Sequence, residues 1–120
     1  MEAWLHKASR FRKSAYRAFD EGEYDLACFL AQQASEFLLK GVLIKEAGAR
    51  PVTHSLYEMA KRLGELRGHT LGEDVARCSK SLEEHYIQAR YPDARLGPYE
   101  KWEAEECLKC MEVIWRWVGG

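Results

Sequence analysis

The chain has 120 residues, of which 47% are hydrophobic and 31% are charged, and its formal net charge at pH 7 is -1. This length is enough for one domain with its own core, so we expect a single domain over residues 1–120. The near-neutral charge excludes a protein that coats nucleic acid with its whole surface. No apolar run approaches the roughly 18 residues of a membrane span, and the first residues lack the apolar segment of a secretory signal, so we expect a cytoplasmic protein without membrane contact.

The first predicted helix covers about residues 2–19, where apolar residues recur at three- and four-residue steps. Its other face is basic and consists of Lys7, Arg10, Arg12, Lys13 and Arg17. This face could hold phosphates or meet an acidic partner. An ordinary solvated face is the alternative.

Residues 24–47 form the predicted helix around which the chain is arranged, because they are apolar over most of the helix circumference. A narrow polar line interrupts that surface at Gln32, Gln33, Glu36 and Lys40. Glu36 and Lys40 are four residues apart in the order that favours an ion pair. The line is either a solvated stripe or a set of polar groups that face a neighbouring helix or a ligand. On the second interpretation Lys40 is a candidate ligand contact.

Two further helices are predicted after a short connection. The third helix begins at a cap on Thr53 or Ser55, since both side chains can accept a hydrogen bond from the first turn. The fourth helix covers residues 70–89 and opens on a capping box at Thr70.

Residues 90–98 contain two prolines and a glycine, so they form a loop. Pro98 can occupy the first position of a last helix that runs to about Val118. No strand is predicted. The fold class is therefore all-α, a bundle of four to five helices.

The cysteines lie inside predicted helices at irregular spacing, at Cys28, Cys78, Cys107 and Cys110. This spacing is a poor match to a secreted disulfide framework, so we expect reduced and mostly buried thiols. Cys107 and Cys110 fall in the middle of a helix, without a second ligand pair, and the histidines form no zinc motif. The sequence therefore predicts no metal site and no cofactor.

His54 has the most distinctive surroundings among the histidines, because it lies at the entrance of the third helix beside Thr53 and Ser55. Backbone N–H groups at the start of a helix favour bound anions. His54 is therefore a candidate phosphate ligand, and a structural hydrogen-bonding histidine is the alternative.

Three segments together resemble the HEPN domain family, specifically its small stand-alone bacterial and archaeal form. They are EGEYDLACFLAQQASEFLLKGVL, the Thr53-His54-Ser55-Leu56 piece, and HYIQARYPD at residues 85–93. The likeness covers almost the whole chain. It implies an all-α up-and-down bundle that is typically dimeric, in a family linked to nucleotides and RNA. Many members of that family act as toxins or metal-independent ribonucleases paired with a small nucleotidyltransferase.

Active members of that family carry an arginine followed four to six residues later by a histidine, near the loop before the last helix. Arg90 occupies that place, but no histidine follows it in the chain. Arg62 and His69 satisfy the spacing formally, across a predicted helix connection, and we interpret them as coincidental. The resemblance therefore leaves enzymatic activity open, with Arg90 as catalytic candidate and His54 or His85 as a histidine that the fold could bring to it.

The loop residues are better suited to holding a phosphate and a base. Arginine forms charge-assisted bonds to phosphate at Arg90 and Arg95, tyrosine stacks on bases at Tyr91, and Asp93 completes the group. An Arg–Asp pair that locks the loop is the alternative.

Further candidate ligand contacts around this loop are Tyr86, His54 and Lys40. The leading hypothesis is a homodimer that binds nucleotide or RNA phosphate beside a small nucleotidyltransferase. The alternatives are a metal-independent endoribonuclease toxin and a plain interaction module whose exposed surface includes Trp102 or Trp117.

Overall fold

The computed structural model describes residues 1–119, and every regular element in that range is a helix. The elements are α1 (Glu2–Asp20), α2 (Tyr24–Ala47), α3 (Leu56–Arg67), α4 (Glu73–Glu83), α5 (His85–Gln88) and α6 (Lys101–Gly119). The predicted all-α bundle is confirmed. Gly120, at which the predicted domain ends, lies outside the described residues.

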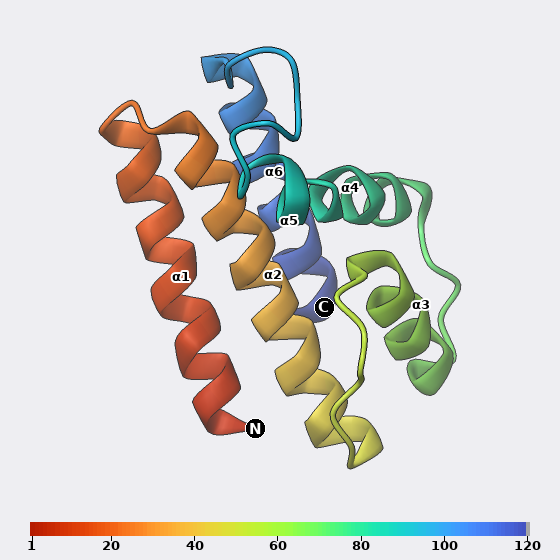
Figure 1. Ribbon diagram of the computed structural model, residues 1–120. Helices are drawn as coiled ribbons and strands as arrows, with labels where there is room; N and C mark the ends of the chain where they lie inside the picture. Colours follow the sequence, from red (N-terminus) through yellow and green to blue (C-terminus); the bar gives the residue numbers. More distant parts are fainter. Residues whose placement is uncertain (120) are drawn as a thin grey trace.

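Helix α2 is the centre of the bundle, as its apolar circumference predicts. It pairs with α1 in an antiparallel hairpin and contacts each of the other four helices (Figure 1). Small residues permit this close packing. A Cβ atom at Gly41 would lie only 2.8 Å from Cδ2 of Leu5, so α1 and α2 approach closely there.

Within residues 1–119, one helix, α2, is long and on average apolar enough to cross a membrane, although the polar line from Gln32 to Lys40 interrupts its apolar residues. Of its most apolar window, however, 72% is buried inside the bundle. Burial against neighbouring helices accounts for this composition, because a helix that is hydrophobic all round must be enclosed by protein or lipid.

The start of α3 follows the capping prediction. The Oγ of Ser55 accepts a hydrogen bond of 3.1 Å from the N–H of Glu58, so Ser55 is the cap. Thr53 lies two residues before Ser55, and its Oγ1 accepts a 3.0 Å hydrogen bond from the N–H of Ser55. The two hydroxyls fix the chain on either side of His54.

Three predicted helix boundaries are wrong, two in the fourth helix and one in the last. Helix α4 begins after Gly72 rather than at Thr70 and ends at Glu83, and α5 is a separate short helix. Gly72 has an extended backbone and is the N-cap of α4, a position at which glycine is accepted. Helix α6 begins at Lys101 rather than Pro98, because the Glu103 carboxylate accepts a 3.0 Å bond from the N–H of Glu100 and caps the helix there.

The expectation of reduced thiols is also wrong, because the four cysteines form two disulfides. Cys28 of α2 pairs with Cys107 of α6, and Cys78 of α4 pairs with Cys110 of α6. The Cα atoms lie 5.2 Å and 4.9 Å apart, within the usual range for a disulfide. Cys107 and Cys110 lie about one turn apart on one face of α6. They pair with different helices, so α6 is linked covalently to both α2 and α4.

Candidate functional site

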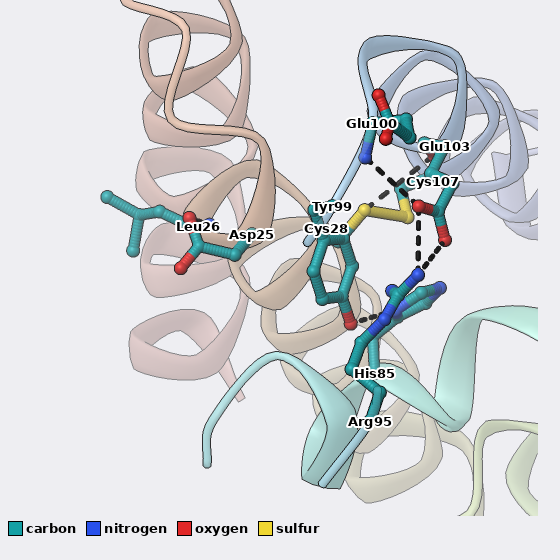
Figure 2. Close-up of a disulfide and its surroundings, with 9 residues drawn as sticks. All are labelled: Asp25, Leu26, Cys28, His85, Arg95, Tyr99, Glu100, Glu103 and Cys107. Carbon is teal, nitrogen blue, oxygen red and sulfur yellow. Dashed lines mark hydrogen bonds and ion pairs between the residues drawn. A yellow bond between two sulfur atoms is a disulfide. The ribbon is translucent and has the colours of Figure 1, made fainter. Parts of the chain in front are cut away.

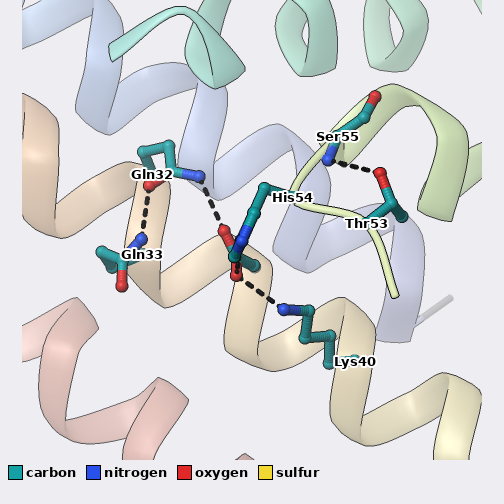
Figure 3. A network of polar contacts seen from close by, with 7 residues as sticks. Gln32, Gln33, Lys40, Thr53, His54 and Ser55 are labelled. Carbon is teal, nitrogen blue, oxygen red and sulfur yellow. Dashed lines mark hydrogen bonds and ion pairs between the residues drawn. The ribbon is translucent and has the colours of Figure 1, made fainter. Parts of the chain in front are cut away.

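The polar line on α2 faces the protein interior and not solvent. Gln32, Glu36 and Lys40 are 0%, 3% and 8% exposed. The Glu36 carboxylate accepts hydrogen bonds from Lys40 Nζ at 2.8 Å and from Gln32 Nε2 at 3.1 Å (Figure 3). The interpretation as a solvated stripe is therefore wrong.

His54 completes this network from outside the helix. Its Nδ1–H donates to the Glu36 carboxylate at 2.9 Å, from the connection that precedes α3 (Figure 3). A carboxylate partner fixes both the orientation and the tautomer of an imidazole. The His54 side chain remains 59% exposed. The neutral ring can therefore present its Nε2 as a hydrogen-bond acceptor or as a base.

The next contacts lead from His54 to α5 and the loop after it. The rings of His54 and Tyr86 stack with centroids 4.7 Å apart and planes inclined by 19°. The Arg90 guanidinium lies over the Tyr86 ring at 5.1 Å and over the Tyr91 ring at 5.7 Å. We call His54, Tyr86, Arg90 and Tyr91 the Arg90 cluster. Arginine stacks favourably on aromatic faces and keeps its N–H donors at the edge of its plane free for a ligand.

Within residues 1–119, the Arg90 guanidinium has no carboxylate within ion-pair distance. It lines a hollow of about 400 Å³ together with Tyr91, Arg95 and Tyr99, and Asp25 of α2 also lines this hollow. This volume is within the range of small-ligand pockets. An unpaired cation at such a hollow is suited to a phosphate.

Arg95 lines the hollow, but its charge is already engaged. Its Nη2 donates to both carboxylate oxygens of Glu103, at 2.9 and 2.7 Å, and its guanidinium lies 4.0 Å from the centre of the Tyr99 ring (Figure 2). Its Nη1 is buried without a hydrogen-bond partner among the described residues. Arg95 thus fixes the loop against α6 in this structure.

Asp93 does not line the hollow beside the Arg90 cluster. Asp93 is exposed, and no ion pair joins it to Arg90 in the described part of the chain. Arg62 and His69 line separate hollows, which agrees with their coincidental spacing.

His85 points elsewhere. Its Nδ1 lies 2.6 Å from the Tyr99 hydroxyl, and burial is the main cause of the lowered pKa of its imidazole.

Of the candidate residues, the structure connects five through a series of contacts that includes Glu36: Lys40, His54, Tyr86, Arg90 and Tyr91. The sequence pattern includes Glu36 in the polar line but does not indicate that its carboxylate is the centre of this hydrogen-bond network. The signal that could have indicated it is the i, i+4 spacing of polar residues on an otherwise apolar helix.

Glu103 gives a prediction about acid stability. Burial raises the pKa of its carboxyl, but hydrogen bonds from the Glu100 N–H and from Arg95 outweigh burial, and the net pKa lies below 4.5. Such a group stabilises the fold above about pH 4.5, and this stabilisation is lost as the pH falls through its folded-state pKa. Glu103→Gln is expected to lower the free energy of unfolding by about 1 kcal/mol at pH 7, and by progressively less as the pH falls through the lowered folded-state pKa of Glu103.

Urea unfolding at several pH values measures this difference. Glu106→Gln is the matched control, since Glu106 is exposed on the same helix. A pH-independent loss for Glu103→Gln would show that packing, and not charge, is responsible.

Comparison with known proteins agrees with this architecture. The HEPN domain family profile matches residues 1–120. Among solved structures, TT1696 from Thermus thermophilus is 33% identical with a TM-score of 0.87, covering 98% of this chain and 94% of that one. ST0689, described as an archaeal HEPN homologue, is 31% identical with a TM-score of 0.78, covering 99% and 94%.

A HEPN domain protein from Thermotoga maritima, TM0613, is 26% identical with a TM-score of 0.70, covering 96% of this chain and 92% of that one. No curated protein matches significantly. The helical bundle and these similarities define a HEPN-type protein. The chain belongs to the HEPN domain family.

Proposed function

We propose that this HEPN protein binds the phosphate of a nucleotide or RNA through Arg90, with a base stacked on Tyr91 or Tyr86. The observation that carries the proposal is the Arg90 guanidinium, which lies over two tyrosine rings at the rim of the 400 Å³ hollow and has no carboxylate partner in the described residues. Charge-assisted bonds from arginine supply affinity for phosphate, and base stacking on tyrosine adds affinity with little sequence preference.

The resemblance to the family extends this proposal. Under the extended proposal, the chain is a cytoplasmic homodimer and an accessory or toxin-like partner of a small nucleotidyltransferase. Of the four tryptophans, Trp102 is 68% exposed, while Trp4, Trp115 and Trp117 are partly buried. Trp102 is thus the tryptophan best exposed for a protein contact, and Trp117 is not. Gel filtration of the purified chain, alone and with such a partner, tests this extension.

The binding proposal is tested with the intact chain, a fluorescent ATP analogue and a labelled single-stranded RNA. Arg90→Ala is expected to weaken binding at least tenfold, because a hydrogen bond to a charged group contributes about 1.5–3 kcal/mol. Arg77→Ala is the matched control: it removes one cation from a side chain that is 69% exposed on α4. Equal affinity in Arg90→Ala and wild type would contradict the proposal.

One observation favours an enzyme as the second candidate. The Glu36 carboxylate orients His54, and the ring of Tyr86 contacts both His54 and Arg90. An oriented imidazole can accept the proton of a ribose 2′-hydroxyl, and a guanidinium can stabilise the charged phosphorane that forms.

RNA cleavage in EDTA separates the two candidates. Cleavage that is lost in both His54→Ala and Arg90→Ala would establish a metal-independent ribonuclease. RNA that is bound but left intact would favour the accessory role.

A further inference from the structure

Cys28, His85 and Cys107 form a second cluster of functional groups, away from the Arg90 cluster. They come from three different helices, α2, α5 and α6, and one ligand atom of each lies within 4.8 Å of the other two. Figure 2 shows the two sulfurs joined as a disulfide with His85 nearby. Two cysteine sulfurs and one imidazole nitrogen are ligands that Zn²⁺ prefers.

His85 is held in an orientation suited to a ligand. Its Nδ1 lies 2.6 Å from the Tyr99 hydroxyl, which leaves Nε2 for other contacts. Tyr99 is in turn covered by Arg95, and Glu103 holds Arg95 in place. Imidazole ligands of metals are commonly oriented by a hydrogen bond at their second nitrogen. The contacts behind His85 provide that support.

Solvent can reach the same cluster. A hollow of about 210 Å³ is lined by His85, Glu103 and Cys107, with Trp102 at its wall. The hollow gives an ion a route to the sulfurs and leaves room for a water molecule as a fourth ligand. Three protein ligands and one open position are common at zinc centres.

The disulfide determines whether the sulfurs can bind a metal. A disulfide sulfur has no thiolate charge, whereas the thiolate is the form that ligates metals. In tetrahedral geometry with Zn–S distances of about 2.3 Å, two sulfurs stand about 3.8 Å apart. The Cβ atoms of a disulfide are already about 3.8 Å apart. After reduction, rotation of the two cysteine side chains can separate the sulfurs to the distance that zinc requires.

We propose that Cys28, Cys107 and His85 form a redox-gated zinc site. A dithiol reductant transfers two electrons and two protons to the Cys28–Cys107 disulfide, so the S–S bond breaks, two thiols form and the dithiol becomes a disulfide. Zn²⁺ then replaces the two thiol protons and binds both thiolates and His85 Nε2. Cytosolic reductants keep most thiols reduced, so in that compartment the metal-binding form is the one expected.

The test uses the full chain, freed of metal by a chelator and titrated with Co²⁺ as a spectroscopic probe and then with Zn²⁺ in competition. After reduction with a phosphine, wild type is expected to bind one Co²⁺ per chain, with a thiolate-to-cobalt band and tetrahedral visible bands. The oxidised chain is expected to lack both. Cys28→Ser should abolish the thiolate pair, and His85→Gln should weaken binding at least tenfold.

The matched control removes the other disulfide through Cys78→Ser and Cys110→Ser together. Those two cysteines belong to no three-ligand group within residues 1–119, so this variant is expected to keep the Co²⁺ spectrum. His85→Gln retains all four cysteines and tests the site if a cysteine variant fails to fold. Absence of binding by the reduced chain, equal binding by the oxidised chain, or loss of binding only in the control would overturn the proposal.

Discussion

Glu36→Ala is expected to lower the free energy of unfolding by about 3–5 kcal/mol, because it leaves a buried lysine without its counter-ion. The side chains of Glu36 and Lys40 are 4% and 10% exposed, and the carboxylate also accepts hydrogen bonds from Gln32 and His54. Removing it therefore leaves several polar groups unsatisfied, and each unsatisfied buried group adds a desolvation cost. Urea unfolding at pH 7 measures the loss.

Two further variants test whether loss of the buried ion pair is the cause of the lower unfolding free energy in Glu36→Ala. Glu46→Ala breaks a more exposed ion pair with Arg67 and is expected to cost about 1 kcal/mol or less. Replacing the buried pair together, by Glu36→Leu with Lys40→Met, is expected to recover most of the stability, since apolar residues of similar volume often replace a buried ion pair without loss. A loss below about 1 kcal/mol in Glu36→Ala would contradict this account of the network.

Reduction of both disulfides, with a chelator present, is expected to be the other large perturbation. The cross-links close segments of 79 and 32 residues, for which the loop-entropy relation gives upper values of about 4.5 and 3.7 kcal/mol. Measured effects are usually smaller, so we expect a combined loss of about 3 kcal/mol or more. For a domain of this size this corresponds to a fall in melting temperature of about 10 °C or more.

Calorimetry with and without a phosphine reductant measures this effect, and thiol titration verifies reduction. In the variant with Cys78→Ala and Cys110→Ala, only one bridge remains and the reductant should have a smaller effect. An unchanged melting temperature in a chain with four titratable thiols would contradict the stabilising role of the cross-links.

Much of the fold follows from local patterns. The apolar circumference of residues 24–47 predicts a central helix with the bounds that α2 has, and the cap at Ser55 follows from its spacing to Glu58. Helix boundaries that depend on tertiary contacts could not be predicted this way. The start of α6 is one example, since the carboxylate that caps it, Glu103, is held by Arg95 from the preceding loop.

The candidate site was predictable in composition but not in geometry. Sequence patterns selected His54, Tyr86 and Arg90, yet nothing local indicates that one tyrosine ring contacts both other residues. Arg95 looked equivalent to Arg90, and only the fold shows that Glu103 engages its charge. The disulfides escaped prediction for the same reason, because the packing of α6 against α2 and α4 decides which sulfurs meet.

The location of ligand binding is the central claim, and amide NMR during a titration with ATP or a short single-stranded RNA tests it most directly. We expect saturable shift changes concentrated at the Arg90 cluster and the hollow beside it, and we expect Arg90→Ala to lose them. The basic face of α1, with Lys13 and Arg17, is the competing location. Shift changes confined to that face, or no saturable change with either ligand, would contradict the account.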